Sequence, residues 1–300
     1  MKIIIYFILF TSLLLSCQKA IEIDREKIKP KLVINCILSP NQDTIKLSLS
    51  ESRDLLYDKS DFPLVENATV SLFENGTKIG DLLLEGAYYI LPYQVKAGAT
   101  YRVEVTKAGF DAVSAETTVN TAPADIAFSA EKIESGIVIA NMTITDIKNE
   151  SSYYMATMQW GDITTDSTIL NDPYYQPYFQ SYNCTDDVII EYPQNDLLSG
   201  SICASQFLFS DASFQNSAHT FTVYSPQNNY YFPQDGYKTI VVIECHTVNY
   251  DYYTYYLTRS IFQDNLGNPF AEPVPVYNNI ENGFGIFGAS TTRTDTLVFE

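Results

Sequence analysis

The sequence predicts a mainly β protein, in which an N-terminal antiparallel β-sandwich precedes a second β-rich domain with long loops and one short helix. Short apolar runs with two-residue alternation recur along the chain and are separated by turn residues. Asn75-Gly76 lies between two such runs, a strong signal for a β-hairpin. Aromatic residues make up 14% of the chain, which excludes a disordered polypeptide.

Residues 1–16 have the pattern of a signal peptide. Lys2 precedes an apolar run from Ile3 to Leu15, too short for a bilayer core of roughly 30 Å, which takes about 20 residues. Leu14-Leu15-Ser16-Cys17 resembles a bacterial lipobox, in which Cys17 becomes the lipidated first residue of the mature chain. The alternative is an ordinary signal peptide with an incidental cysteine.

Residues 17–30 are charged and lack apolar periodicity, which predicts a flexible linker from the lipidated cysteine. Lys19 and the acidic residues after it resemble the export signal of Bacteroidota surface lipoproteins. Each buried CH₂ contributes about 0.8 kcal/mol to anchoring, and stable attachment needs more than one acyl chain. We therefore expect palmitate on Cys17 and a chain held at the outer membrane, facing the cell exterior.

Residues 31–122 predict the first domain. "KLVINCIL" and "TIKLSLSES" flank a turn-rich connection, and later runs also alternate, so that Val103 and Val105 face one side of their strand. Seven or so short strands in roughly 90 residues are typical of an antiparallel sandwich. Their order resembles immunoglobulin-like and transthyretin-like sandwiches, which are scaffolds of many unrelated proteins and do not define a function.

Pro123 marks the start of the second domain, residues 123–300. Polar, proline-rich sequence between 161 and 218 predicts long loops on a sheet, where binding often occurs. The helix is expected in "NYDYYTYYLTRSIFQDNLG", with Asp251 as N-cap and Gly267 near its end. Its tyrosines also permit a strand.

The charge of the mature chain excludes nucleic acid as a partner. Cleavage before Cys17 removes Lys2 alone, so 17 Lys and Arg face 36 Asp and Glu, and the net charge is about −19. Binding to nucleic acid needs cationic patches that release counterions. A solvated acidic surface accounts for the balance.

Four cysteines follow Cys17 and allow three disulfide pairings. Cys184 and Cys203 flank one polar, turn-rich segment, which favours that pair, and closing such a loop would contribute roughly 3 kcal/mol. Cys36 and Cys245 lie in apolar β-like runs and are interpreted as buried thiols.

The sequence contains no catalytic or metal-binding motif. Its two histidines, His219 and His246, lie in separate predicted strands without metal-ligand spacing. We therefore expect no enzyme activity, no metal and no cofactor. A hydrolase that uses His219 or loop carboxylates stays open as an alternative, since triad residues need only meet in space.

One loop is the candidate ligand or partner surface. Tyr174, Tyr175, Tyr178 and Phe179 lie close together in "NDPYYQPYFQSYNC". Tyrosine rings offer an apolar face and a polar tip, which suits contacts with a sugar or peptide. The alternative is packing of a long loop onto the sheet.

The segment "NPFAEPVPVYNNIENGFGIFGAS", residues 268–290, resembles the closing signature of the Bacteroidota outer-membrane lipoprotein family "domain of unknown function 4249". "KLVINCILSP" and "NATVSLFENG" fit the layout of that family too. The resemblance implies an accessory or binding partner of a TonB-dependent transporter. An autonomous glycan- or protein-binding adhesin is the alternative. From the residues themselves, the prolines and glycines predict an extended strap that packs the C-terminal strand.

Overall fold

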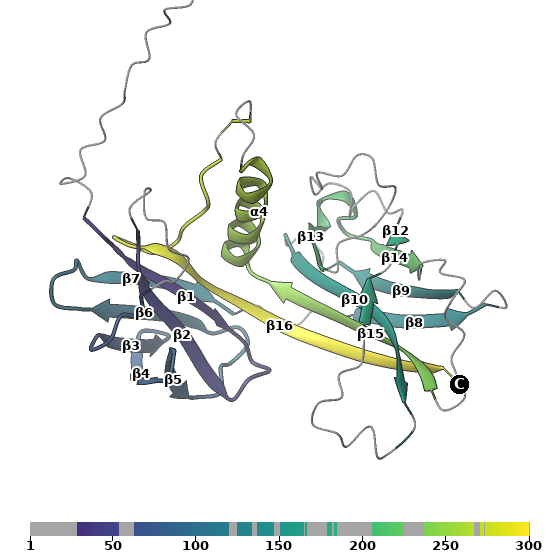
Figure 1. Cartoon of the computed structure of the whole chain (residues 1–300), viewed down its shortest axis with the longest axis horizontal. Coiled ribbons are helices and arrows are strands. Elements are labelled where there is room, and N and C mark those ends of the chain that lie inside the picture. Colours follow the sequence, from purple (N-terminus) through teal and green to yellow (C-terminus); the bar gives the residue numbers. More distant parts are fainter. Residues whose placement is uncertain are drawn as a thin grey trace, which may run out of the picture. The chain divides into compact units, whose positions relative to one another are not determined.

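The computed structural model divides the chain into two units, residues 1–30 with 53–59, and residues 31–52 with 60–300. The second unit holds every strand and helix presented below (Figure 1). The structure describes residues 29–53, 63–119, 125–133, 137–146, 151–164, 166, 179–181, 183–184, 206–224, 237–266, 271–272 and 274–299.

The described residues form seventeen elements longer than a turn, all strands but one, so the predicted mainly β fold is confirmed. The first seven strands are β1 Leu32–Leu38, β2 Thr44–Glu51, β3 Thr69–Glu74, β4 Thr77–Glu85, β5 Tyr88–Pro92, β6 Thr100–Thr106 and β7 Val113–Thr118. The remaining elements are β8 Asp125–Lys132, β9 Val138–Thr145, β10 Tyr153–Thr164, β11 Phe179–Ser181, β12 Asn183–Cys184, β13 Gln206–Ser210, β14 Ala218–Tyr224, β15 Tyr237–Val248, α4 Tyr250–Asn265 and β16 Phe284–Phe299. A 3₁₀ turn, η2, covers Asp211–Ser213.

The first seven strands wrap around one hydrophobic core in the order β1-β2-β5-β4-β3-β6-β7. Burial alternates along β1 and β6, as period-two sequences require, and Ile34 and Val103 are fully buried within the core. The β3–β4 turn has Asn75 and Gly76 at φ 48° and 81°. Left-handed geometry at both residues is what this type of hairpin turn needs, so the predicted hairpin is confirmed.

Strand β16 belongs to both halves of the chain. Its first six residues pair in parallel with β1, from Val33 beside Phe284 to Leu38 beside Ala289. Residues 290–299 pair antiparallel with β15. The first core therefore includes Ile280, Phe287 and Ala289 from the C-terminal segment.

The second half is also a pair of sheets around one core. Strands β10, β13, β15 and the end of β16 form one sheet, with β11 at its edge, and β12-β14-β9-β8 form the other. Tyr154, Phe209 and Phe221 fill the space between them with stacked and tilted rings. The predicted boundary at 122/123 falls in residues 120–124, outside the described residues. The predicted signal peptide, residues 1–16, and all of the linker except residues 29–30 lie outside them too.

Helix α4 confirms the predicted helix, but its N-cap is Asn249 and not Asp251. The Asn249 side-chain oxygen accepts hydrogen bonds from the backbone N–H of Tyr252 and of Ala289, at 3.1 and 3.2 Å. Its amide nitrogen donates to the Thr117 hydroxyl of β7. Asp251 lies within the first turn, where its carboxylate accepts from the Tyr277 hydroxyl at 2.6 Å.

The segment 277–283, which we call the strap, confirms the structural interpretation of the signature. The Asn279 side chain pairs with the backbone of Phe287 through two hydrogen bonds, at 2.8 and 3.0 Å. Glu281 forms a bridge with Ser114 of β7. Gly285 has φ 109°, and a Cβ there would overlap the carbonyl oxygen of Ile34, so glycine lets the backbone of β16 approach that of β1 closely.

Candidate functional site

Most of the residues singled out in the sequence lie outside the described part of the chain. These are Cys17, Tyr174, Tyr175, Tyr178 and Cys203. Phe179 lies in β11 and Cys184 in β12, which the structure describes as backbone only. The lipid anchor, the Cys184–Cys203 disulfide and the tyrosine surface therefore stay predictions.

Cys36 and Cys245 are buried free thiols, as predicted. Cys36 is 3% exposed in the first core and Cys245 is fully buried in the second. Burial raises the pKa of both thiols to about 12, because a thiolate would lose its solvation. Neither has the thiolate character of a reactive cysteine.

The two histidines occupy separate strands. His219 in β14 stacks on Phe214 at 5.3 Å and meets the edge of Phe221 at 4.5 Å, which is a packing role. His246 in β15 has Nδ1 2.8 Å from the Thr292 hydroxyl and Nε2 3.8 Å from a Glu244 oxygen. Desolvation lowers the pKa of His246, so the ring is neutral at pH 7.

The contact between His246 and Thr292 is part of a polar row across the sheet. At one end of this row, the Thr157 hydroxyl of β10 donates to a Glu244 carboxylate oxygen at 3.4 Å. At the other end, Asn41 binds the backbone of Thr292. The Asn41 side chain accepts from the Thr292 N–H at 2.8 Å and donates to its carbonyl at 2.9 Å. This amide therefore fixes the β1–β2 turn against β16.

The polar row ends at an open pocket of about 550 Å³. The residues that line it all carry polar side chains: Asn41, Gln42, Asp43, Thr44, Lys46 and Gln94. Gln94 is held by a 2.7 Å bond to the Pro40 carbonyl, and Asn41 by Thr292, so two of the walls are fixed before any ligand arrives. Within the described residues, Asp43 and Lys46 form no ion pair with each other or with a third side chain. The pocket thus offers one anion, one cation and fixed amides.

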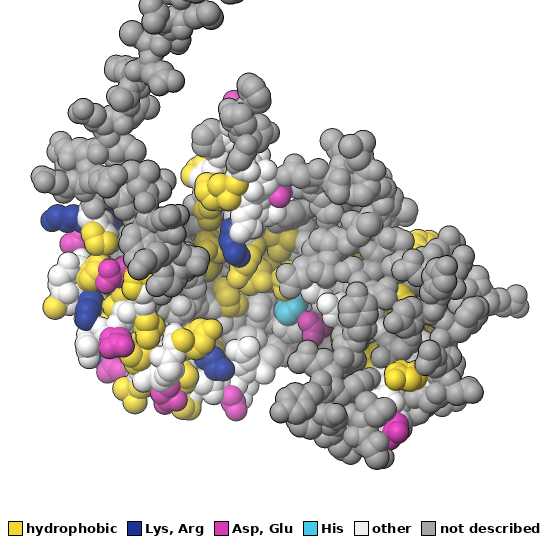
Figure 2. Space-filling model, in the orientation of Figure 1, with side chains coloured by type: hydrophobic (Ala, Val, Ile, Leu, Met, Phe, Trp, Pro, Cys, Tyr) yellow, Lys and Arg dark blue, Asp and Glu magenta, His cyan; other side chains and the backbone are white. Residues whose placement is uncertain are grey.

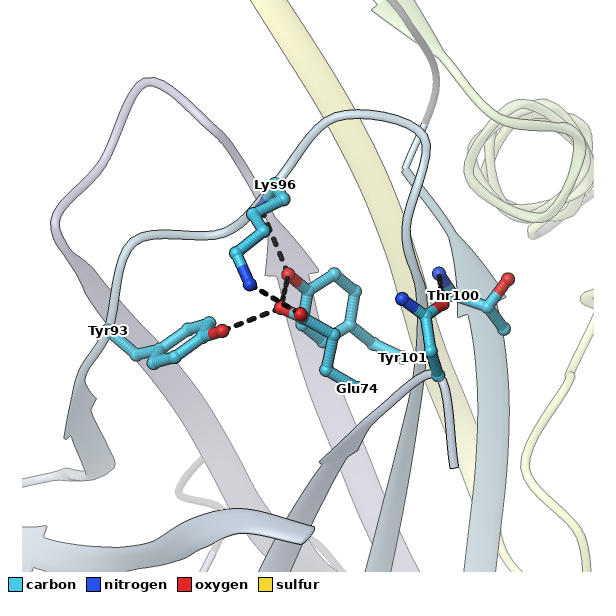
Figure 3. Close-up of polar contacts among 6 residues, drawn as sticks. Glu74, Tyr93, Lys96, Thr100 and Tyr101 are labelled. Carbon is cyan, nitrogen blue, oxygen red and sulfur yellow. Dashed lines mark hydrogen bonds and ion pairs between the residues drawn. The ribbon is translucent and has the colours of Figure 1, made fainter. Parts of the chain in front are cut away.

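A cluster around the half-buried Glu74 carboxylate supports the loop that carries Gln94 (Figure 3). Glu74, at the end of β3, accepts hydrogen bonds of 2.6 Å from the hydroxyls of Tyr93 and Tyr101 and from the Lys96 ammonium. The Lys96 backbone N–H donates to the Tyr101 hydroxyl at 2.9 Å. These bonds hold residues 93–96 against the sandwich and fix the rim of the pocket.

The same cluster shifts the ionisation of Glu74. Hydrogen bonds from Lys96, Tyr101 and Tyr93 lower the pKa of this carboxyl from 4.5 to about 2, and the charge of Lys96 adds to the shift. Burial and the bond to Glu74 raise the pKa of the Tyr101 hydroxyl. Every polar atom of Glu74 is already engaged, so the cluster stabilises the loop and has no free group for catalysis.

Helix α4 presents a second surface. Its inner face packs on Ile37, Tyr153 and Met155, while Phe262 and Leu266 near its end are 41% and 64% exposed. Figure 2 shows hydrophobic side chains gathered beside α4, and acidic and basic side chains interspersed over the N-terminal strands. Single exposed apolar residues of this kind are common at protein surfaces and do not define a site.

The described residues contain no group of three or more His, Cys, Asp or Glu side chains arranged to hold a metal ion. Across the same part of the chain, no helix has both the length and the apolar character needed to cross a membrane.

The fold and these surfaces define a class of protein: a mainly β chain with two cores joined through one C-terminal strand, and a polar pocket beside that strand. The chain belongs to the family of the domain of unknown function DUF4249, whose model matches residues 18–296. The predicted family is thereby confirmed. The match covers the signature, the strap and both cores.

No curated protein matches the chain. Solved structures with weak similarity to the chain include the following two. A glycosyl hydrolase family 2 member from Bacteroides cellulosilyticus is 11% identical, with 71% of this chain and 27% of that chain covered and a TM-score of 0.21. Beta-glucuronidase 3 from Bacteroides uniformis is 13% identical, with coverage of 72% and 23% and a TM-score of 0.19. The chain spans about a quarter of the length of these proteins, and TM-scores this low carry no argument about activity.

Sequence reasoning missed the polar pocket. Its residues come from the β1–β2 turn, the start of β2 and the loop after β5, and the loop meets the other two only in the folded sheet. The sequence signal was the run Asn41-Gln42-Asp43, which was interpreted as a turn alone. Turn residues are polar for backbone reasons too, so the run by itself does not separate a turn from a binding loop.

Proposed function

We propose that the chain is a lipid-anchored outer-membrane protein that faces the cell exterior and acts, without catalysis, as an accessory partner of a TonB-dependent transporter. The observation that carries the proposal is the Leu14-Leu15-Ser16-Cys17 motif after a short apolar signal. Stable anchoring needs more than one acyl chain, and a diacylated cysteine meets this need. The transporter is the partner that the family resemblance implies.

The pocket beside Asn41 supports a binding role. Its charged groups, Asp43 and Lys46, are of opposite sign and unpaired within the described residues, so a polar loop or ligand can meet both. Asn41 and Gln94 are held by their own hydrogen bonds, which reduces the side-chain entropy lost on binding. Binding energy would come from these fixed groups and the two charges.

The polar row argues for binding over hydrolysis. Thr292, His246 and Glu244 place a hydroxyl, an imidazole and a carboxylate in a row. A nucleophile and its base are arranged in this order. However, the 3.8 Å separation of His246 from Glu244 exceeds a hydrogen bond, and the Thr292 N–H is taken by Asn41. A nucleophile on this strand would lack the backbone donor that often stabilises an oxyanion.

The anchor is tested by metabolic labelling with an alkyne-bearing palmitate analogue. We expect label on the wild-type chain and loss of both label and membrane attachment in Cys17→Ala. A Cys17→Ala chain that still partitions into membranes would contradict the anchor.

The partner is tested by extracting the tagged lipoprotein in mild detergent and identifying what co-purifies by mass spectrometry. We expect a stoichiometric TonB-dependent transporter. Paired substitution of Asp43 and Lys46 by alanine should reduce its recovery, whereas the same change at Lys78 and Asp81, a surface ion pair at 2.7 Å on β4, should not. A lipoprotein that purifies alone would refute the accessory role.

The second candidate function is an autonomous glycan- or protein-binding adhesin. The polar walls of the pocket favour it, because amides and charged groups suit sugar hydroxyls. Glycan-array binding by the purified chain, lost on Asp43→Ala or on Tyr174→Ala with Tyr175→Ala, would support this candidate and would also separate the two surfaces.

A further inference from the structure

Strand β16 extends beyond the end of β1 and leaves one of its edges open there (Figure 1). Residues 284–289 pair with β1 on this edge, whereas residues 290–299 pair with β15 on the opposite one. Within the part of the chain that the structure describes, no strand pairs with the β1 side of β16 after Ala289. We name the free part, residues 293–299, the outer edge of β16.

The contact with Asn41 shows which way the backbone groups of this edge point. The Asn41 amide accepts from the Thr292 N–H at 2.8 Å and donates to the Thr292 carbonyl at 2.9 Å, on the side away from β15. These are the two bonds that a residue of an added antiparallel strand would form. Because the backbone direction alternates along a strand, the N–H and carbonyl groups of Thr294, Thr296 and Val298 point the same way.

The outer edge is exposed and lacks the bulge or proline that closes many sheet edges. Residues 293–296 are exposed, and Val298 is 54% exposed. Pairing with β15 runs without a register shift, and the edge contains no proline. Among the described residues, only the neighbouring Asp295 carboxylate reaches an outward N–H, that of Thr296 at 2.8 Å. An unpaired row of this kind is a template for a further strand.

The inner side chains of the outer edge define the strand that it can take. The Arg293 guanidinium lies over the Phe128 ring of β8, 5.8 Å from its centroid, and Leu297 and Phe299 pack against the second core. Alternation places Asp295 on the same face. Within the described residues, neither of these two charged side chains forms an ion pair. Opposite charges that face each other across two strands stabilise the pair, so the matching strand carries an acid opposite Arg293, a base opposite Asp295 and apolar side chains opposite the other two.

A second copy of the chain does not meet these requirements. Two outer edges that pair antiparallel over their full length are centred on Thr296. Each charged side chain then lies opposite an apolar one, Arg293 opposite Phe299 and Asp295 opposite Leu297. A shorter overlap centred on Asp295 places two carboxylates opposite each other, which is destabilising. Charge complementarity therefore favours a strand from a different protein.

We propose that the outer edge of β16 binds an extended segment of the protein partner, which joins the sheet as an antiparallel strand of complementary charge. Antiparallel pairs are slightly more stable per residue than parallel ones. Main-chain hydrogen bonds provide the affinity in this mode of binding, and the side chains select the sequence. The segment continues the line of β1 past Asn41, which contacts Thr292 and also lines the pocket. Strand addition by itself needs no transporter; the source of the segment, the transporter, rests on the proposed function.

The edge is tested by appending a complementary strand to the C-terminus of the full-length chain. The sequence Asn-Gly-Lys-Val-Thr-Ile-Thr-Lys-Thr-Glu, added after Glu300, forms a tight turn and then runs antiparallel along the outer edge. Its glutamate lies opposite Arg293 and its second lysine opposite Asp295. The short turn gives the strand an effective concentration on the order of millimolar, so that weak pairing is also populated. Hydrogen exchange over residues 293–299, measured by mass spectrometry, should slow by about tenfold or more relative to the wild type.

Variants of the added strand separate pairing from mere proximity. Proline in place of its central threonine, opposite Thr296, removes a ladder donor and should abolish the protection. Exchanging its last lysine and its glutamate should reduce the protection about two- to fivefold, and R293E with D295K in β16 should restore it. If the doubly substituted chain fails to fold, the variants of the added strand still decide the matter. An added strand that protects no more than its proline version overturns the proposal.

The source of the segment is tested with the same chains in the mild-detergent co-purification. The added strand fills the edge, so it should lower recovery of the transporter several-fold, while the proline version should leave it unchanged. Equal recovery with both chains overturns the proposal and leaves the proposed function intact, because the transporter would then bind elsewhere. If the wild type recovers no transporter, the proposed function fails, whereas protection of the outer edge by the added strand still supports strand addition.

Discussion

Replacing Gly285 with alanine tests the junction between β16 and β1. Gly285 has φ 109°, and an added Cβ would overlap the Ile34 carbonyl oxygen and lie 2.9 and 3.1 Å from the Ile34 carbonyl carbon and nitrogen. These are backbone atoms in the middle of a buried strand, so they cannot rotate away as a side-chain end can. The substitution must either strain the backbone or separate the two strands.

The expected cost follows from two contributions. Holding a residue with a Cβ in left-handed geometry costs roughly 1–2 kcal/mol, and forcing extra volume into a packed core costs about 1–3 kcal/mol. We therefore expect G285A to lower the free energy of unfolding by about 2–5 kcal/mol. Two matched variants separate these contributions. G76A adds left-handed strain with no atom within 4 Å, and G288A adds a 3.2 Å contact with the end of the Ile37 side chain without left-handed strain.

Urea unfolding of the three variants, followed by tyrosine and tryptophan fluorescence, gives the free energies and their m-values. G76A should cost about 1–2 kcal/mol and G288A less than about 1 kcal/mol. The reasoning is refuted if G285A costs no more than G76A, because β1 would then accommodate the Cβ without penalty. If G285A does not fold while G76A and G288A do, the result agrees with the reasoning.

Three further predictions concern a half-buried carboxylate, a buried cap and two buried thiols. The pKa of Glu74 is about 2 in the folded chain and 4.5 without its partners. The carboxylate therefore stabilises the fold fully above pH 4.5, and this contribution is lost as the pH falls toward 2. In chemical denaturation, the difference in unfolding free energy between wild type and E74Q should shrink as the pH is lowered. N249A should destabilise the chain by about 2–4 kcal/mol, because it removes the cap of α4 and the hydrogen-bond partner of Ala289 and of Thr117. N249D keeps the acceptor oxygen and should cost less in the same assay. Equal losses of stability in the two variants would contradict this role of Asn249. Cys36 and Cys245, whose pKa values are raised to about 12, should resist iodoacetamide at pH 8 until urea unfolds the chain, as peptide mass spectrometry would show; rapid labelling of the native chain would contradict their burial.

The sequence predicted local structure well wherever one residue pattern has one physical solution. Alternation in "LVINCIL" became β1, and Asn75-Gly76 became a hairpin turn with both residues in left-handed geometry. The helix was predicted from its apolar spacing, but its start was placed two residues late. Asn249 and Asp251 are both good N-cap residues, and only the contact of Asn249 with β16 and the bond of Asp251 to Tyr277 separate them.

Contacts between distant segments were not predictable in the same way. Nothing in the alternation of β16 indicates that its first residues pair with β1 and its last with β15. The pocket combines Asn41 with Gln94 through sheet topology and not through spacing. Motif-based reasoning finds sites whose ligands are close in sequence, and these are not.

The division of β16 between two sheets has a consequence for the order in which the chain can fold. Synthesis delivers β1 first, yet its parallel partner, residues 284–289 of β16, emerges long after it. Pairing across such a separation is slow, and the edge of β1 stays open until it occurs. The first sandwich therefore depends on the arrival of β16, and a chain cut short before Phe284 would lose a strand from both halves at once. Such a chain would offer two unpaired edges to chaperones and proteases, so the presence of β16 becomes a condition for the survival of the folded chain.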